Sequence, residues 1–158
     1  MQELAKNFIY KTAINIARAR SFFGYVRNAE SRIMVVTDTQ ILLVQSRGSQ
    51  KWNFPGGGLA TNEDPKHTAL RELYEECHIA LAEVDFKLGH YTTTKKDNPY
   101  HVFIFVAQIQ KPITPKPSLE ILQAKWFSFD HLPEGLHPVV IRRIHEYRNH
   151  KRDLDTSW

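Results

Sequence analysis

The segment that most constrains this chain is residues 64–79, DPKHTALRELYEECHI, which carries a strong helix signal. Asp64 is a favourable N-cap and Pro65 suits the first helical position. Helical spacing places the larger apolar side chains on one stripe, made of Leu70, Leu73, Tyr74 and Cys77. The sequence therefore predicts a helix that starts after Asp64 and ends near Cys77.

The opposite side of this helix carries glutamates at an end where negative charge is unfavourable. Glu72, Glu75 and Glu76 are three and four residues apart, so their carboxylates are neighbours. The helix dipole disfavours negative charge in the last turn, and Arg71 is the helical cation within reach. A solvated acidic face is the simpler interpretation of such glutamates alone. A polyvalent cation would instead turn their mutual repulsion into attraction.

Hydrophobic periodicity predicts further elements on both sides of this helix. We expect helices at 3–19 (within an N-terminal segment, 1–22) and at about 138–149, a strand hairpin at 31–37 and 40–46, and strands at 84–93, 100–109 and 122–128. The Gly-rich run 55–58 and the Pro-rich segment 111–117 are expected to be loops. This order predicts an α+β fold, an α/β/α sandwich around a mixed β-sheet, in a single domain over residues 1–158.

Two of these elements carry specific predictions about side-chain direction. In the last strand, Leu122, Ala124 and Trp126 are expected on one side. In the last helix, the residues expected to face inward are Val140, Ile141, Ile144 and Tyr147, and those expected to face outward are Arg142, Arg143 and Arg148.

Composition excludes several classes of protein and site. Cys77 is the single cysteine, which excludes a disulfide framework, a cysteine zinc site and an iron–sulfur cluster. The longest apolar run, 102–107, is too short to cross a bilayer, and the first 30 residues lack a secretory signal, so we expect a cytoplasmic protein without membrane contact. The net charge of +4 favours anionic partners. No Walker A or G-x-G-x-x-G sequence supports a P-loop or Rossmann site.

The spacing of glycine and charged residues from 57 to 79 resembles the Nudix box. It reads Gly57-x5-Glu63-x7-Arg71-Glu72-Leu73-x-Glu75-Glu76-x-His78-Ile79. The preceding WNFPGG and LLVQS segments resemble the usual lead-in to that box, and the resemblance covers residues 30–150. Asn62 and His78 stand where the family has glycine, and both residue types tolerate positive φ. The resemblance implies a Nudix-type fold.

Clustered carboxylates without histidine or thiolate partners favour Mg²⁺, with Mn²⁺ as the alternative, over Zn²⁺. Because Mg²⁺ prefers to share oxygens with substrate phosphates, such a site implies a phosphate-bearing substrate. The resemblance implies hydrolysis of a nucleoside diphosphate linked to another moiety, by in-line attack of water on phosphorus. ADP-ribose-like compounds, nucleotide sugars and nucleoside triphosphates all stay open as substrates.

The resemblance also implies roles for individual residues. The expected metal ligands are Gly56 (through its carbonyl), Glu72, Glu75 and Glu76. Arg71 is expected to orient Glu72 and Glu63 through charge-assisted hydrogen bonds. The general base stays open between Glu72 and Glu120, so the catalytic set is Arg71, Glu72, Glu76 and Glu120. Substrate contacts are expected at Arg47, Trp52, Gly57 and Gly58, although core packing is the simpler role for Trp52.

Two alternative functions stay open at this point. One is pyrophosphohydrolysis at the 5′ end of RNA, motivated by basic residues in the first and last helices and beyond: Arg18, Arg20, Arg142, Arg143, Arg148, Lys151 and Arg152. The other is a non-catalytic nucleotide sensor built on the same fold. A homodimer is compatible with the resemblance, but no residue pattern predicts one.

Overall fold

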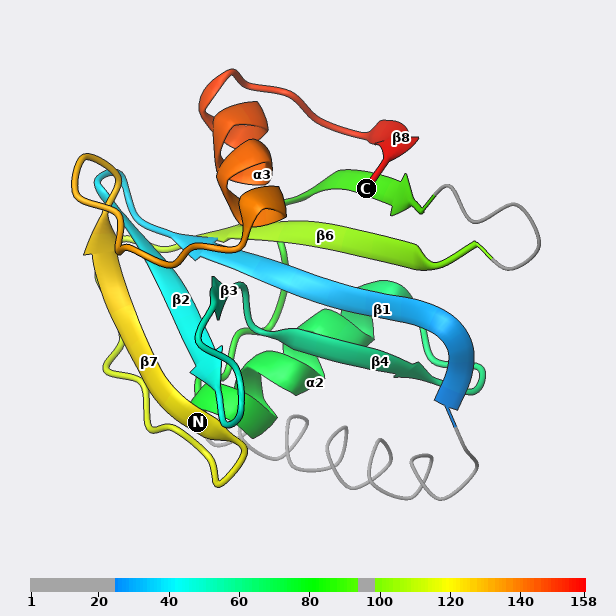
Figure 1. Ribbon diagram of the computed structural model, residues 1–158, viewed down its shortest axis with the longest axis horizontal. Coiled ribbons are helices and arrows are strands. Elements are labelled where there is room, and N and C mark those ends of the chain that lie inside the picture. Colours follow the sequence, from blue (N-terminus) through cyan, green and yellow to red (C-terminus); the bar gives the residue numbers. More distant parts are fainter. Residues whose placement is uncertain (1–24, 94–98) are drawn as a thin grey trace, which may run out of the picture.

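The computed structural model describes residues 25–93 and 99–158, and its centre is a mixed β-sheet (Figure 1). The strands are β1 (Tyr25–Val36), β2 (Gln40–Ser46), β3 (Trp52–Asn53), β4 (Gly56–Ala60), β5 (Phe86–Thr92), β6 (His101–Gln108), β7 (Ile121–Ser128) and β8 (Leu154–Ser157), and the helices are α2 (Pro65–Cys77) and α3 (Pro138–Arg148). The strand order is β3-β2-β1-β6-β5-β8, with β4 paired to β1 and β7 paired to β2. The helix predicted at 3–19 lies outside the described residues.

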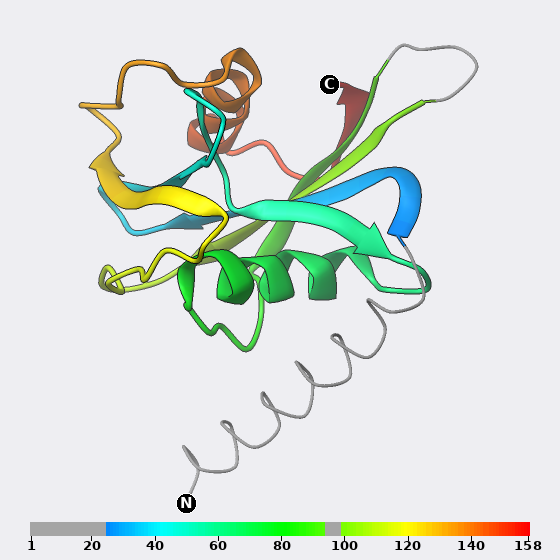
Figure 2. The same ribbon diagram turned by 60° about the horizontal axis from the view of Figure 1, so that its bottom comes forward.

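The two helices cover opposite faces of the sheet, as Figures 1 and 2 show. Successive side chains of β1 alternate between two cores, because side chains of a strand point to opposite faces. Ile33 and Val35 pack with the buried stripe of α2, whereas Met34 and Val36 pack with residues of α3. This two-sided burial confirms the predicted α+β sandwich around a mixed sheet. No helix in the described part of the chain is long and apolar enough to cross a membrane.

The helix signal and its caps are confirmed. The Asp64 carboxylate accepts hydrogen bonds from the backbone N–H groups of Lys66 and His67 at the start of α2. Asn62 and His78 adopt φ values of 63° and 54°, so both residues in the family's glycine positions occupy the left-handed region. The predicted hairpin is β1 and β2, and β5, β6 and β7 correspond to the other predicted strands.

The glycine-rich run is a strand, not the predicted loop. Gly56 pairs with Arg32 of β1, and Gly57 pairs with Ser31. The two backbones approach so closely that a Cβ at Gly56 would collide with the Ser31 carbonyl oxygen and the Arg32 side chain. The absence of side chains therefore permits this pairing, where sequence alone suggests irregular backbone. Strand β8, parallel to β5, is a further element that the sequence analysis does not predict.

The orientation predicted for α3 is wrong at two positions. Arg143 is 1% exposed, whereas Ile141 is 50% exposed. The guanidinium carbon of Arg143 lies 3.9 Å from the centre of the Tyr91 ring, and its Nη1 donates a 3.0 Å hydrogen bond to Oε1 of Glu146. These contacts replace water around the buried cation and let α3 turn Arg143 inward.

The prediction that Leu122 shares a face with Ala124 is also wrong, because β7 contains a bulge. Two neighbouring residues of β2, Gln45 and Ser46, pair with Gln123 and Ile121, and Leu122 between them has no partner in β2. Leu122 is therefore the extra residue, and it is 48% exposed while Ala124 is buried.

Candidate functional site

A groove of about 800 Å³ runs between the C-terminal half of α2 and the loop that leads into β7. It is lined by Arg47, Glu72, Tyr74, Glu75, Glu76, His78, Pro117, Ser118, Leu119, Glu120, Ile121 and Leu122. The structure thus brings the three glutamates of α2 together with Glu120 and Arg47. Five of the residues predicted for the site therefore share one concave surface.

Behind this groove, Arg71 forms hydrogen bonds with several of the glutamates. Its guanidinium is buried and forms a fork with Glu63, from Nε to Oε1 (2.9 Å) and from Nη2 to Oε2 (3.0 Å). Nη1 donates to Oε1 of Glu72 at 2.6 Å and to Oε2 of Glu75 at 2.9 Å. Nη2 also donates to the Gly58 carbonyl oxygen at 3.2 Å. Arg71 therefore links Glu63 to Glu72 and Glu75 through direct hydrogen bonds.

Burial and the Arg71 charge set the protonation of these carboxyl groups. Burial alone would raise the pKa of Glu63, but the hydrogen bonds and charge of Arg71, with hydrogen bonds from Thr68 and the Ala60 amide, together outweigh that effect and lower the pKa. The pKa of Glu72 is raised, because burial outweighs the attraction of Arg71. Burial raises the pKa of Glu76 to about 8, against the opposing hydrogen bond from the Gly56 amide. In the metal-free protein, burial therefore disfavours ionisation of the Glu76 carboxyl group at neutral pH.

Strand β4 supplies the surface against which two of the glutamates rest. The Gly56 N–H donates a 2.9 Å hydrogen bond to Oε2 of Glu76. A Cβ at Gly57 would lie 2.7 Å from the carboxyl carbon of Glu72, so that carboxyl group fills the space of a missing side chain. The glycines of β4 thus let the acidic side of α2 approach the strand closely.

The donor set fits a hard divalent cation, although the glutamates are engaged by protein groups. Within residues 25–93 and 99–158, no three histidine, cysteine, aspartate or glutamate side chains stand ready to enclose a metal. Glu72 and Glu75 face Arg71, and Glu76 faces Gly56. A cation bound in the groove would share these carboxylates with Arg71. An all-oxygen set suits Mg²⁺ or Mn²⁺ better than Zn²⁺.

The loop that carries Glu120 is tied to both α2 and β2. The Ser118 N–H donates to the Glu76 carbonyl oxygen at 3.0 Å. Arg47 donates from its backbone N–H to the Glu120 carbonyl oxygen (2.8 Å) and from Nε to the Leu119 carbonyl oxygen (2.6 Å). Glu120 itself is exposed on the rim of the groove, and its charge contributes to the raised pKa of Glu76.

Trp52 does not reach this groove. It belongs to the core on the α3 side of the sheet, where its ring centre lies 4.8 Å from that of Phe127. The structure therefore gives Trp52 the packing role. Of the residues predicted to contact substrate, Arg47 lines the groove, whereas Trp52, Gly57 and Gly58 do not.

Arg32 of β1, a residue that was not among those predicted from the sequence, lies beside the site, because it pairs with Gly56. Its guanidinium donates to Glu30 and to the Phe54 carbonyl oxygen. The signal was an arginine inside an apolar strand, two residues after a glutamate on the same side of that strand.

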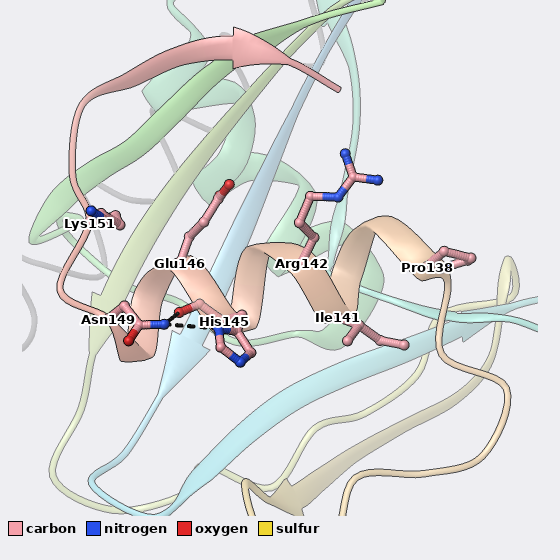
Figure 3. Close-up of a pocket in the computed structure, with 7 residues that line it drawn as sticks. All are labelled: Pro138, Ile141, Arg142, His145, Glu146, Asn149 and Lys151. Carbon is pink, nitrogen blue, oxygen red and sulfur yellow. Dashed lines mark hydrogen bonds between the residues drawn. The ribbon is translucent and has the colours of Figure 1, made fainter.

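A second groove, of about 680 Å³, lies along the exposed side of α3, on the opposite face of the sheet (Figure 3). It contains none of the residues predicted for catalysis and is lined by Pro138, Ile141, Arg142, His145, Glu146, Asn149 and Lys151. Of the basic residues that motivated RNA binding, Arg142 and Lys151 line this groove and Arg143 is buried. Arg18 and Arg20 lie outside the described residues.

Comparisons with known proteins agree with this geometry. The NUDIX domain family model matches residues 27–147. A putative 8-oxo-dGTP diphosphatase of Bacillus subtilis (strain 168) is 28% identical over 125 residues, which cover 79% of this chain and 82% of that protein. Phosphatase NudJ of Escherichia coli (strain K12) is 27% identical over 132 residues, covering 80% and 82%. A solved NUDIX hydrolase from Nitrosomonas europaea is 27% identical, with a TM-score of 0.64 and coverage of 80% and 91%.

Proposed function

Because this chain belongs to the NUDIX family of hydrolases that act on phosphoric anhydride bonds, we propose that it is a Mg²⁺-dependent pyrophosphohydrolase. Its substrate is a nucleoside diphosphate linked to another moiety. The observation that carries this proposal is the groove lined by Glu72, Glu75 and Glu76, in which buried Arg71 binds the first two carboxylates and the Gly56 amide binds the third. Acidic groups crowded at the negative end of a helix cost stability unless a cation joins them.

The residues in and behind the acidic part of the groove have separate roles in this proposal. Glu72, Glu75 and Glu76, with the Gly56 carbonyl, hold Mg²⁺, which when bound neutralises phosphate oxygens. Arg71 keeps the Glu72 and Glu75 carboxylates in place through its 2.6 and 2.9 Å hydrogen bonds. Glycine at position 57 leaves the space that the Glu72 carboxyl group occupies. A water molecule attacks one phosphorus, the bridging P–O bond on the far side breaks, and a nucleoside monophosphate is released.

Two carboxylates compete for the role of general base. Glu72 is partly buried and already accepts a 2.6 Å hydrogen bond from Arg71. Glu120 is exposed on the opposite rim, on a loop that Arg47 holds by two hydrogen bonds. An exposed carboxylate is free to accept a proton from the attacking water, so we assign the base to Glu120 and a ligand role to Glu72. The same position lets Arg47 contact a substrate phosphate.

The test is a hydrolysis panel with Mg²⁺ or Mn²⁺ and identification of the products. It contains 8-oxo-dGTP and unmodified nucleoside triphosphates, ADP-ribose and nucleotide sugars. 8-oxo-dGTP is included because the similar Bacillus subtilis protein is described as a putative 8-oxo-dGTP diphosphatase. We expect a nucleoside monophosphate from at least one substrate, and loss of that activity in Glu76→Gln. An inactive wild-type protein, or a fully active Glu76→Gln variant, would contradict the proposal.

The assignment of the general base is tested by comparing the Glu120→Gln and Glu72→Gln variants. Glu120→Gln should lower kcat by about 100-fold or more, within the usual contribution of a general base, and leave metal affinity unchanged. Glu72→Gln should weaken the metal site itself. A Glu120→Gln variant with normal kcat would move the base to Glu72.

A further inference from the structure

Arg32 of β1 is a buried cation beside the site to which nothing above assigns a part in the reaction. Its side chain is 17% exposed, and each of its three guanidinium nitrogens donates a hydrogen bond to a protein group. Nε and Nη2 donate to the two oxygens of Glu30, at 2.7 and 3.1 Å, and Nη1 donates to the Phe54 carbonyl oxygen at 3.1 Å. A fork of this kind fixes both partners in direction as well as in distance.

These contacts hold the segment that leads into β4. Phe54 is completely buried, and Arg32 binds its carbonyl oxygen. The next carbonyl, that of Pro55, accepts a 2.9 Å hydrogen bond from the Ile33 N–H. Two successive carbonyl groups before Gly56 are therefore anchored by two successive residues of β1.

The anchored segment ends at the atom that contacts Glu76. Gly56 pairs directly with Arg32 across the two strands, and a Cβ at Gly56 would lie 2.7 Å from Cγ of Arg32. The Gly56 N–H then donates its 2.9 Å hydrogen bond to Oε2 of Glu76. The stem of Arg32 thus sets the position of the Gly56 backbone, and that backbone sets the direction of the Glu76 carboxyl group.

A second hydrogen bond extends the same chain of contacts to Tyr100, the residue before β6. The Tyr100 hydroxyl donates to Oε2 of Glu30 at 3.2 Å, so both oxygens of Glu30 are occupied. Glu30 is thereby held from two sides and gives Arg32 a fixed partner. Neither Glu30 nor Tyr100 lines the groove itself.

We propose that Arg32 is a positioning residue for the metal-binding face of the groove, acting through the Gly56 amide on the Glu76 carboxyl group. This proposal rests on the proposed function, because the orientation of Glu76 matters to the extent that Glu76 binds a cation. Residues that support a metal ligand in this indirect way typically change metal affinity or activity by about 10- to 100-fold when they are replaced.

The experiment compares Arg32→Met with Arg143→Met. Methionine keeps an apolar stem of similar length but removes the charge and the donors. Arg143 is the matched control, because it is also buried and also paired with a glutamate, yet it lies on the α3 side of the sheet. Three quantities are measured for both variants: amide hydrogen exchange at Gly56 in the metal-free protein, Mn²⁺ affinity, and kcat and KM.

For Arg32→Met we expect Gly56 exchange to be about 10-fold faster relative to amides of β2 and β7, the equivalent of about one lost hydrogen bond. Mn²⁺ affinity and kcat should each fall by about 10- to 100-fold, with a much smaller change in KM. Arg32→Lys keeps a charge near Glu30 but cannot form the fork, so it should fall between wild type and Arg32→Met. Arg143→Met should lose stability and change none of the three quantities.

Unchanged Gly56 exchange and Mn²⁺ affinity in Arg32→Met would overturn the proposal, and so would an equal effect of Arg143→Met. If Arg32→Met does not fold, Glu30→Gln replaces it, because this change weakens the fork and keeps the arginine. The exchange measurement needs no turnover, so it tests Arg32 even if every substrate of the panel is left intact. A panel in which no substrate is hydrolysed would count against the proposed function alone.

Discussion

The carboxyl group of Glu72 occupies the place where a side chain at residue 57 would stand: a Cβ built on Gly57 lies 2.7 Å from its carboxyl carbon. Contacts this short do not occur between real atoms of these types. The helix and β4 therefore approach as closely as they do because residue 57 is glycine.

Gly57→Ala tests this relationship. The added methyl group must displace the Glu72 carboxyl group, and misplacing a catalytic group by about 1 Å can cost about 100-fold in rate. We expect a fall in kcat of that order, measured in a steady-state assay on whichever substrate the panel identifies. Circular dichroism should show an intact fold. A variant with wild-type kcat would mean that the position of Glu72 is not critical.

Arg71→Met should both destabilise the protein and remove its activity. The change leaves Glu63, Glu72 and Glu75 without their shared cation, and breaking a buried ion pair in this way costs about 3–5 kcal/mol. Urea unfolding measures the decrease in the free energy of unfolding. Arg71→Lys is the control that retains the charge, and it should recover part of the stability but little activity, because an ammonium group cannot form the same fork.

Divalent cations should raise the melting temperature of the wild-type protein. A ligand that binds the folded state alone stabilises it by about 2.7 kcal/mol at a concentration 100 times its dissociation constant. Differential scanning fluorimetry with EDTA and then with excess Mg²⁺ gives the shift without any substrate. Glu76→Gln should abolish most of the shift, while Glu134→Gln, at an exposed position outside the groove, should keep it.

The lowered pKa of Glu63 predicts a dependence of stability on acid. A carboxyl group whose pKa is lower in the folded protein stabilises the fold above its ordinary pKa of 4.5, and this contribution is lost as the pH falls through the lower, folded-state value. Urea midpoints should therefore drop on acidification below about pH 5. Glu63→Gln should be less stable than wild type at neutral pH and show a shallower acid loss. Parallel curves for the two proteins would exclude this role.

Local sequence signals predicted the helix α2 and its surroundings well. Asp64, Pro65 and the apolar stripe act within one or two turns, and the spacing of the glutamates follows from helical geometry alone. The strands of the hairpin and of β5 and β6 carry similarly local alternation or dense apolar runs. For the same reason, the proximity of Glu72 and Glu75 to Arg71 could be expected before the fold was known.

The features that were missed depend on partners distant in sequence. Arg143 is buried because Tyr91 lies under it, and Leu122 is exposed because of a bulge against β2. The glycines of β4 become a strand because β1 accepts them at close range, a contact with no local signature. Arg32 escaped notice because its partner Phe54 is 22 residues away.

The residue at the C-terminal end of α2, His78, affects both the helix end and the neighbouring loop. His78 accepts a left-handed backbone that suits glycine better, but its Nδ1 lies 2.8 Å from the Lys116 carbonyl oxygen, to which it donates. A glycine at position 78 would adopt the left-handed backbone more easily. It would also remove one of the hydrogen bonds that hold residues 116–120 beside the glutamates. The histidine thus accepts a less favourable backbone conformation and in return ties the loop at residues 116–120 to the end of α2.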